Sequence, residues 1–417
     1  MPNSLGGMHT KNFMLDNGLK VAIYSAPQFQ TVGVSVGVKY GSVDENPRIN
    51  GAAHYLEHML FKGTKKRTWK EINEIPRNLG MVRNAFTDKE TTTYFLGTYK
   101  GYFDKALDLL SDQIINSTFP EKEFELERGP IINENLIYND SPIYMFYDFL
   151  PKALYKKHPA RMPIGGDEAA IRRTRMSDIL RIYDGHYSPR NMLVSIYGAV
   201  SVDKALGAVK RYFGGFEKKY TSQTRNRTRE KQVHKEITVT KKGIRQTRLG
   251  IGFKARGFGD AGLEEYLAVS VISEILSRRL FDEIREKRGL SYDPRSSYSV
   301  YNTFGFVAAA AGIEPAKMDE TKDVMLKEFE KLQNGEVTKD EVKKRAHGLS
   351  ISLLTSREDT LGMALSISEA YLLYGDSTLT ERMPELIDRV SLDDIRKYSG
   401  KYIDVDRYGL VVLKPKK

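Results

Sequence analysis

An internal repeat constrains the fold of this chain most, because the same pattern of segments occurs twice at a fixed spacing. Residues 31–39 (TVGVSVGVK) alternate apolar and small residues, as a half-buried strand does, and residues 247–254 (TRLGIGFK) repeat the pattern about 215 residues later. The 215-residue offset also carries residues 191–198 onto residues 406–413, and both segments have strand patterns. An offset that holds at both ends of a unit indicates duplication, so we expect two halves with one fold.

The segment between the two copies has the composition of a linker. Residues 217–236 are polar and charged, with few apolar residues. A chain of 417 residues is also too long for one ordinary core. We therefore expect an N-terminal domain at 1–216, this linker at 217–236, and a homologous C-terminal domain at 237–417. Strand patterns mixed with helical ones in each half predict an α+β fold, an antiparallel or mixed sheet with helices packed on it.

Composition places the chain among water-soluble globular proteins. Hydrophobic residues make up 40% and charged residues 29%, and no window approaches eighteen consecutive apolar residues, so we expect no membrane span. The first residues lack the basic and apolar regions of a secretory signal and the arginine-rich look of a transit peptide, which predicts a cytoplasmic location. The absence of cysteine rules out disulfides and thiolate metal ligands and fits a reducing compartment.

The net charge of +11 does not by itself indicate nucleic-acid binding. Such binding needs the charge concentrated on a recognisable groove-sized module. The densest basic stretch, residues 218–248, is interrupted by Glu230 and Glu236 and is typical of a solvated linker. We therefore expect no nucleic-acid partner, and at most a mild preference for acidic ones.

Two histidines with a glutamate between them point to specific chemistry. His54 and His58 lie four residues apart within a mostly apolar, helix-forming stretch, and Glu57 precedes the second. Positions i and i+4 share one face of a helix, so both imidazoles can reach one ion, and Glu57 projects to the same side. The set predicts a hydrolytic zinc centre with an adjacent carboxylate. The alternative is a structural helix that carries two satisfied histidines.

A catalytic zinc needs a third protein ligand and one position left open for water. The remaining histidines are scattered, which indicates surface or packing roles, so a carboxylate is the natural third ligand. The acidic segment 121–137 offers Glu127 and Glu134, which share a helix face because they are seven residues apart. One could bind the metal and the other support a ligand histidine. A solvated acidic face is the alternative. Glu57 is the candidate general base, since a neighbouring carboxylate can accept a proton from a water acidified by the metal.

The order His-x-x-Glu-His reverses that of the commoner zinc proteases and is typical of the inverzincins. The wider pattern resembles the pitrilysin and mitochondrial-processing-peptidase-like metallopeptidases over nearly the whole chain. The stretches that carry the resemblance are residues 15–20, Gly41-Ser42, 51–64, Asn84-Ala85-Phe86-Thr87 with Glu90, Thr92 and Tyr94, Glu127-Arg128, Glu134, Asp140-Ser141-Pro142, 163–166, 187–192 and 280–292.

The resemblance implies a role for each matching residue of the metal site. His54, His58 and Glu134 would be the ligands of one Zn²⁺ per chain, Glu57 the base, and Glu127 the support behind the histidines. The second half has no ligands at the corresponding positions, since the 215-residue offset carries His54 onto Val269 and His58 onto Ser273.

The resemblance also implies substrate-binding groups outside the metal site. Arg285 and Tyr292 would grip the substrate backbone and polarise the scissile carbonyl. The hairpin pattern at 82–96 would pair with the substrate as an added strand, with Asn84 and Ala85 near its start; an ordinary interior hairpin is the alternative. Gly129-Pro130 departs from a helical pattern, and we expect a kink there, since proline removes an amide donor.

These features together predict a zinc endopeptidase that cleaves peptides or unfolded polypeptide segments, and the resemblance implies that cleavage takes place inside a closed chamber. The resemblance implies that chains of this size associate in pairs, and because this chain carries both motifs we expect a homodimer. One alternative is a non-catalytic polypeptide-binding or partner subunit of a processing-peptidase-like complex. Another is a zinc hydrolase for a non-peptide substrate.

Overall fold

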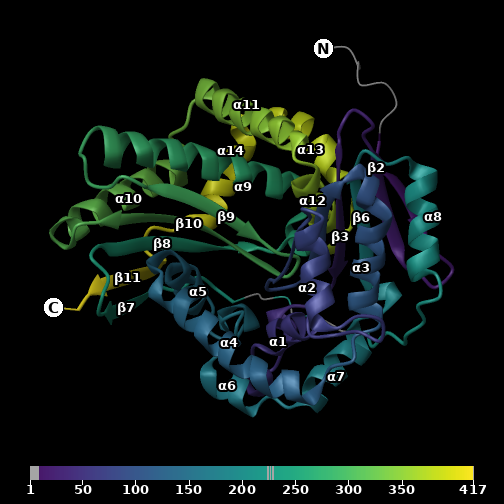
Figure 1. Ribbon diagram of the computed structural model, residues 1–417. Coiled ribbons are helices and arrows are strands. Elements are labelled where there is room, and N and C mark those ends of the chain that lie inside the picture. The colour runs from purple at the N-terminus through teal and green to yellow at the C-terminus, as the bar shows by residue number, and fades with distance from the viewer. Residues whose placement is uncertain (1–8, 223–224, 226, 228–229, 417) are drawn as a thin grey trace. The chain divides into compact units, whose positions relative to one another are not determined.

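The computed structural model describes residues 9–222, 225, 227 and 230–416. These residues form two compact units, each built around one sheet (Figure 1). The first unit takes its described residues from Met1–Glu134, Pro163–Thr224 and Thr355–Arg382. The second unit takes them from Asn135–Met162, Arg225–Leu354 and Met383–Lys417.

The first unit has a six-stranded mixed sheet in the order β1-β2-β6-β3-β5-β4. Its β2–β6 pair is parallel and the other neighbouring strands are antiparallel. The strands are β1 (Lys11–Met14), β2 (Lys20–Ser25), β3 (Thr31–Val38), β4 (Val82–Thr87), β5 (Thr92–Tyr99) and β6 (Met192–Gly198). Its helices are α1 (Ala52–Met59), α2 (Trp69–Asn78), α3 (Phe103–Ile115), α6 (Glu168–Arg173), α7 (Met176–His186), α8 (Val202–Phe213) and α12 (Thr360–Tyr374), with α4 (Glu121–Asp140) beginning in this unit and α13 (Leu379–Asp388) ending outside it. Short helical turns are η1 (Ser42–Asp44), η2 (Pro47–Ile49), η3 (Lys100–Tyr102), η5 (Pro189–Asn191) and η8 (Ser356–Glu358).

The second unit has a five-stranded mixed sheet in the order β7-β11-β8-β10-β9. Here the β7–β11 pair is the parallel one. The strands are β7 (Lys235–Lys241), β8 (Thr247–Arg256), β9 (Arg295–Val300), β10 (Phe304–Ile313) and β11 (Gly409–Pro415). The helices are α5 (Pro142–Leu154), α9 (Phe258–Leu280), α10 (Met318–Gln333), α11 (Lys339–Thr355) and α14 (Leu392–Tyr402), with the turns η4 (Pro159–Arg161), η6 (Phe281–Glu286) and η7 (Pro315–Lys317).

Strand β3 is buried on both faces, so the expectation of a half-buried strand was wrong. Its valines face the main core of the first unit, whereas its glycines face α12. A Cβ atom added to Gly33 would lie 2.3 Å from the carbonyl oxygen of Thr360, and one added to Gly37 would lie 2.4 Å from Leu372 Cδ1. The small residues of the pattern therefore allow a helix to pack closely on the sheet.

The second unit repeats this arrangement with a helix from the other half of the sequence. Gly250 and Gly252 of β8 face α5, where added Cβ atoms would lie 1.9 Å from Phe146 Cε2 and 2.7 Å from Leu150 Cδ1. Leu249, Ile251 and Phe253 face the opposite way, into the core. The glycine-rich strand of each half is thus covered by a helix that the other half supplies (Figure 1).

The predicted fold class, an α+β chain of two similar sheet-and-helix units, is confirmed by the two sheets and by the structural relatives described below. The compact units differ from a simple division of the sequence at 217–236. Residues 135–162 belong to the second unit although they precede the linker, and residues 355–382 belong to the first unit although they follow it. The expected domain boundaries stay a prediction about the repeat itself.

Two prolines that interrupt helical patterns are accommodated inside helices. Helix α4 runs from Glu121 to Asp140 through Pro130. Helix α2 contains Pro76 near its end, and the Pro76 carbonyl accepts a bond from Met81. The expected kink at Gly129-Pro130 does not end the helix, so Glu127 and Glu134 remain two turns apart on one element. Among the described residues, no helix has the length and apolar character needed to cross a bilayer.

Candidate metal centre

Helix α1, which carries His54, Glu57 and His58, begins at a specialised cap. Gly51 is the N-cap residue with φ of +94°, and a Cβ there would lie 2.6 Å from the carbonyl oxygen of Gly165. Only glycine adopts this conformation without strain at so close an approach. The buried carboxylate of Glu45 accepts hydrogen bonds from the backbone N–H of Gly51 at 2.7 Å and of Ala53 at 2.6 Å. It therefore fixes the first turn of the helix.

The two histidines and Glu134 converge on one point. The Nε2 atoms of His54 and His58 are 3.2 Å apart. Glu134 Oε2 lies 3.2 Å from His58 Nε2 and 3.7 Å from His54 Nε2. In the described residues these three make the one group of at least three potential ligands with all donor atoms within 4.8 Å of one another. Ligands bonded tetrahedrally to zinc at about 2.0–2.2 Å lie about 3.3–3.6 Å apart, so the donor set fits zinc in type and spacing.

Burial and charge act differently on the two imidazoles. Burial, with His58 nearby, lowers the pKa of His54 to about 4. Burial also lowers the pKa of His58, but the hydrogen bonds that its ring donates to the carboxylates of Glu127 and Glu134 outweigh this effect and raise the pKa to about 9. A metal ion bound at Nε2 would replace that proton, because histidine binds metal in its neutral form.

Glu127 supports His58 from the side away from the convergence point. Its Oε1 lies 2.9 Å from His58 Nδ1, and its Oε2 forms an ion pair with the ammonium of Lys62. A carboxylate at Nδ1 fixes the ring orientation and the tautomer that leaves Nε2 free to bind metal. Burial raises the pKa of Glu127, but the bonds from His58 and Lys62 lower it overall, so the carboxylate is ionised.

Glu57 lies on helix α1, directly before His58, and its side chain contacts strand β4. The residue is 7% exposed, and Oε2 accepts a hydrogen bond of 2.7 Å from the hydroxyl of Thr87 on β4. Burial raises the pKa of Glu57 to about 7, against the lowering effect of Thr87 and His58. A carboxyl with this pKa can accept and return a proton near neutral pH.

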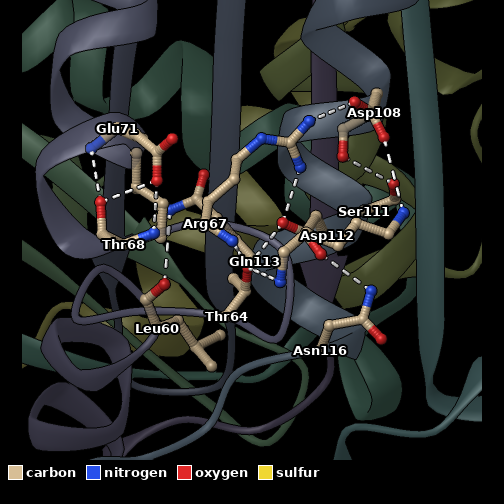
Figure 2. Close-up of polar contacts among 12 residues, drawn as sticks. Leu60, Thr64, Arg67, Thr68, Glu71, Asp108, Ser111, Asp112, Gln113 and Asn116 are labelled. Atoms are coloured by element: carbon tan, nitrogen blue, oxygen red, sulfur yellow. Dashed lines mark hydrogen bonds and ion pairs between the residues drawn. The ribbon is translucent and has the colours of Figure 1, made fainter.

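The connection between α1 and α2 is held by a polar network (Figure 2). Arg67 donates to Asp112 at 2.6 Å and also to Asp108, both on α3. The Thr64 hydroxyl donates to Asp112 at 2.7 Å, and Asn116 donates to the same carboxylate at 2.9 Å. Thr64 and Arg67 are thereby attached to α3, which fixes the chain just after the metal-bearing helix.

Strand β4, proposed from the sequence as the substrate-binding strand, lies at an edge of its sheet. It pairs with β5 in the predicted hairpin, with Thr87 opposite Thr92. Val82 and Phe86 are 62% and 42% exposed, and Asn84 is exposed as well, whereas Ala85 and Thr87 face inward. In the part of the chain that the structure describes, no strand occupies the other side of β4.

Arg285 and Tyr292 come together within the second unit. The Arg285 guanidinium lies 4.2 Å from the centre of the Tyr292 ring and 4.8 Å from that of Phe281. Arg285 is part of the π-helical turn η6, a feature that often marks functional positions. Tyr292 is 79% exposed, so its hydroxyl is accessible to a ligand. The roles of these residues stay predictions.

Sequence reasoning missed three residues that hold the site: Glu45, Lys62 and Thr87. Lys62 and Thr87 both lie in stretches already quoted for the family resemblance, although neither was given a role, and the position of Lys62 one turn beyond His58 is a local signal. Glu45 and Thr87 make contacts that depend on how distant segments fold together, and neither contact has a signature in the local sequence.

Comparison with known proteins agrees with the geometry. The fold and the inverted histidine motif define a metallopeptidase-type architecture of two similar halves. Residues 20–168 match the profile of the insulinase family, peptidase family M16, and residues 176–349 match that of the M16 inactive domain. An uncharacterized zinc protease of Rickettsia felis is 30% identical over 395 residues, which cover 93% of each chain. The chain belongs to the M16 peptidase family.

Further relatives cover the chain to the same extent. An uncharacterized zinc protease of Bacillus subtilis is 28% identical over 406 residues, or 97% of this chain and 98% of that one. A protease from Helicobacter pylori has a solved structure that superposes with a TM-score of 0.91 at 24% identity, covering 98% of this chain and 100% of that one. An M16-like peptidase from Alicyclobacillus acidocaldarius superposes with a TM-score of 0.87 at 19% identity, covering 98% and 99%. These structural likenesses concern the fold.

Proposed function

We propose that this chain is a zinc-dependent endopeptidase that hydrolyses peptides or unfolded polypeptide segments. The observation that carries the proposal is the convergence of His54, His58 and Glu134, with the Glu57 carboxylate beside them. A zinc ion held by these three ligands, one per chain, would acidify a water molecule and polarise a carbonyl group. Membership in the M16 family and relatives described as zinc proteases support the same conclusion.

Each residue of the site has a separate role in this proposal. Glu57 accepts the proton of the attacking water at its carboxylate and then gives it to the leaving amine, a cycle suited to a pKa of about 7. Glu127, through His58 Nδ1, keeps the histidine oriented. The exposed edge of β4, with Asn84 and Ala85, pairs with the substrate backbone as an added strand. Backbone pairing explains how such a site accepts many sequences.

We further propose that two copies of the chain enclose the reaction in a chamber. Arg285 and Tyr292 of one copy would then bind the substrate at the metal site of the other, where an arginine and a phenol can stabilise negative charge developing on the carbonyl oxygen. A peptide partner, a homodimer and a cytoplasmic location belong to this proposal. A non-catalytic binding subunit is less well supported, because the donor set and the base are both complete.

The first test is peptide cleavage by the zinc-loaded protein and by Glu57→Gln. The variant keeps the size of the side chain but cannot accept a proton, so kcat should fall by at least about 100-fold while zinc per chain stays the same. Glu125→Gln, on an exposed residue of α4, is the matched control and should cleave normally. Undiminished cleavage by Glu57→Gln would reject the assigned base.

Mixed dimers test the assignment of Arg285 to the partner copy. Glu57→Gln and Arg285→Ala are prepared separately as inactive dimers and then allowed to exchange subunits. If Arg285 acts across the dimer, one site of the mixed dimer has both groups intact, and activity returns. If both groups act within one chain, each site lacks one of them, and mixing restores nothing.

A further inference from the structure

The Glu57 carboxylate can act as a base only if a neighbouring group holds it in one position. Glutamate has three rotatable side-chain bonds, and Glu57 sits on a helix of only eight residues. Its carboxylate nevertheless has a side-chain donor in Thr87, whose Oγ1 lies 2.7 Å from Glu57 Oε2, and the backbone N–H of the same residue also faces the carboxylate. No other side chain among the described residues donates a hydrogen bond to this carboxylate.

Thr87 is itself held rigidly, so it can fix the orientation of the Glu57 carboxylate. It is 9% exposed and ends the strand β4, where its backbone is paired in register with Thr92. A β-branched side chain on a strand has few rotamers, so the direction of the hydroxyl is set by the backbone. A hydroxyl bonded to Oε2 leaves Oε1 available to accept a proton.

We propose that Thr87 is a positioning residue for the general base: its hydroxyl orients the Glu57 carboxylate for proton transfer. The inference deepens the proposed function and rests on it. Thr87 and Ala85 lie on the same inward face of β4, because alternate residues of a strand share a face. Strand β4, which is proposed to pair with the substrate, therefore also orients the base, and so it sets the position of the Glu57 carboxylate relative to the substrate backbone.

The test compares Thr87→Val, which replaces the hydroxyl by a methyl group of similar size, with Thr87→Ser, which keeps the hydroxyl. Thr98→Val is the matched control. Thr98 is a buried threonine on β5, the strand adjacent to β4, and its hydroxyl has no hydrogen-bond partner among the described residues. The three variants and the wild type are assayed for kcat, KM and zinc per chain.

We expect Thr87→Val to lower kcat roughly 10- to 100-fold, because a displaced catalytic group loses that much rate. KM should change by less than about 2-fold and zinc per chain should not change, because the substrate and metal contacts remain. Thr87→Ser should recover kcat to within about 3-fold of the wild type, and Thr98→Val should match the wild type. A kcat of Thr87→Val equal to that of Thr98→Val would overturn the inference, as would a Thr87→Ser variant no better than Thr87→Val.

A second readout does not depend on turnover. Crystal structures of metal-free Thr87→Val and Thr98→Val should differ at Glu57, with its carboxylate displaced from the site of Thr87 only in the first variant. An unmoved carboxylate in both would also overturn the inference. Failure of the proposed function is recognised separately, because in that case the wild type itself, loaded with zinc, cleaves no peptide.

Discussion

Removing the Asp112 carboxylate should destabilise the first unit more than any exposed ion pair does. The Asp112 side chain is fully buried and accepts hydrogen bonds from Thr64, Arg67 and Asn116 at 2.6–2.9 Å (Figure 2). In Asp112→Ala these donors lose their acceptor together. Arg67 is only 17% exposed, so water cannot readily replace the lost carboxylate.

The size of the effect follows from burial. Breaking a buried ion pair from one side costs about 3–5 kcal/mol. Arg67 keeps its second partner, Asp108, which is 26% exposed, so we expect a loss at the lower end, about 3 kcal/mol. In a double-mutant cycle with Arg67→Met, the two losses should be non-additive by about 1–2 kcal/mol, because the second mutation removes the charge that the first left unpaired.

The assay is urea unfolding followed by tryptophan fluorescence. The chain has one tryptophan, and Trp69 begins α2, two residues after Arg67. Its signal therefore reports the unfolding of the segment in question. Asp104→Ala is the control, since the Asp104–Arg211 pair is 51% and 65% exposed and should contribute less than about 1 kcal/mol. An Asp112→Ala variant as stable as Asp104→Ala, or an additive cycle, would refute the reasoning.

The remaining predictions concern the support of the metal ligand His58, the packing of α12 on the sheet, and the dependence of stability on pH. Lys62→Met removes the ammonium group that pairs with Glu127, the carboxylate that supports His58. Competition with a zinc chelator should show that the variant binds zinc roughly 10-fold more weakly, and an unchanged zinc affinity would contradict this. Gly33→Ala should increase amide exchange throughout α12, because a methyl group cannot fit against that helix, whereas Gly207→Ala, with open space around it, should not. Burial raises the pKa of Asp293, but Arg248 lowers it overall, below the ordinary 3.8. The ionised form of Asp293 therefore stabilises the fold at pH values above 3.8, and this stabilisation is lost as the pH falls through the lowered pKa. In chemical unfolding, Asp293→Asn should be less stable than the wild type at pH 7, and the difference in stability between the two should shrink at low pH. A difference in stability that does not depend on pH would contradict this.

The part of the site that could be predicted from sequence is the part set by local geometry. His54, Glu57 and His58 lie within one helical turn and a half, so their common face follows from the residue spacing. Glu134 is separated from His58 by seventy-five residues, and its assignment required the resemblance to a family. The structure brings all of these side chains together, while their catalytic roles await experiment.

The remaining features depend on tertiary structure. The alternation of glycine and valine in β3 predicts a strand, but burial of its glycine face depends on α12, which lies more than 300 residues away. The bond from Thr87 to Glu57 likewise joins an edge strand to a helix. Local pattern carries no information about such contacts, because a glycine or threonine on a strand is equally compatible with solvent and with a packed helix.

Anomalous diffraction at the zinc absorption edge, from crystals of the zinc-loaded chain, tests the central claim most directly. We predict one strong peak per chain, bonded to His54 Nε2, His58 Nε2 and a Glu134 oxygen at about 2.0–2.2 Å. No peak between the two imidazoles in the presence of excess zinc, or a peak that leaves Glu134 unbound, would contradict the account.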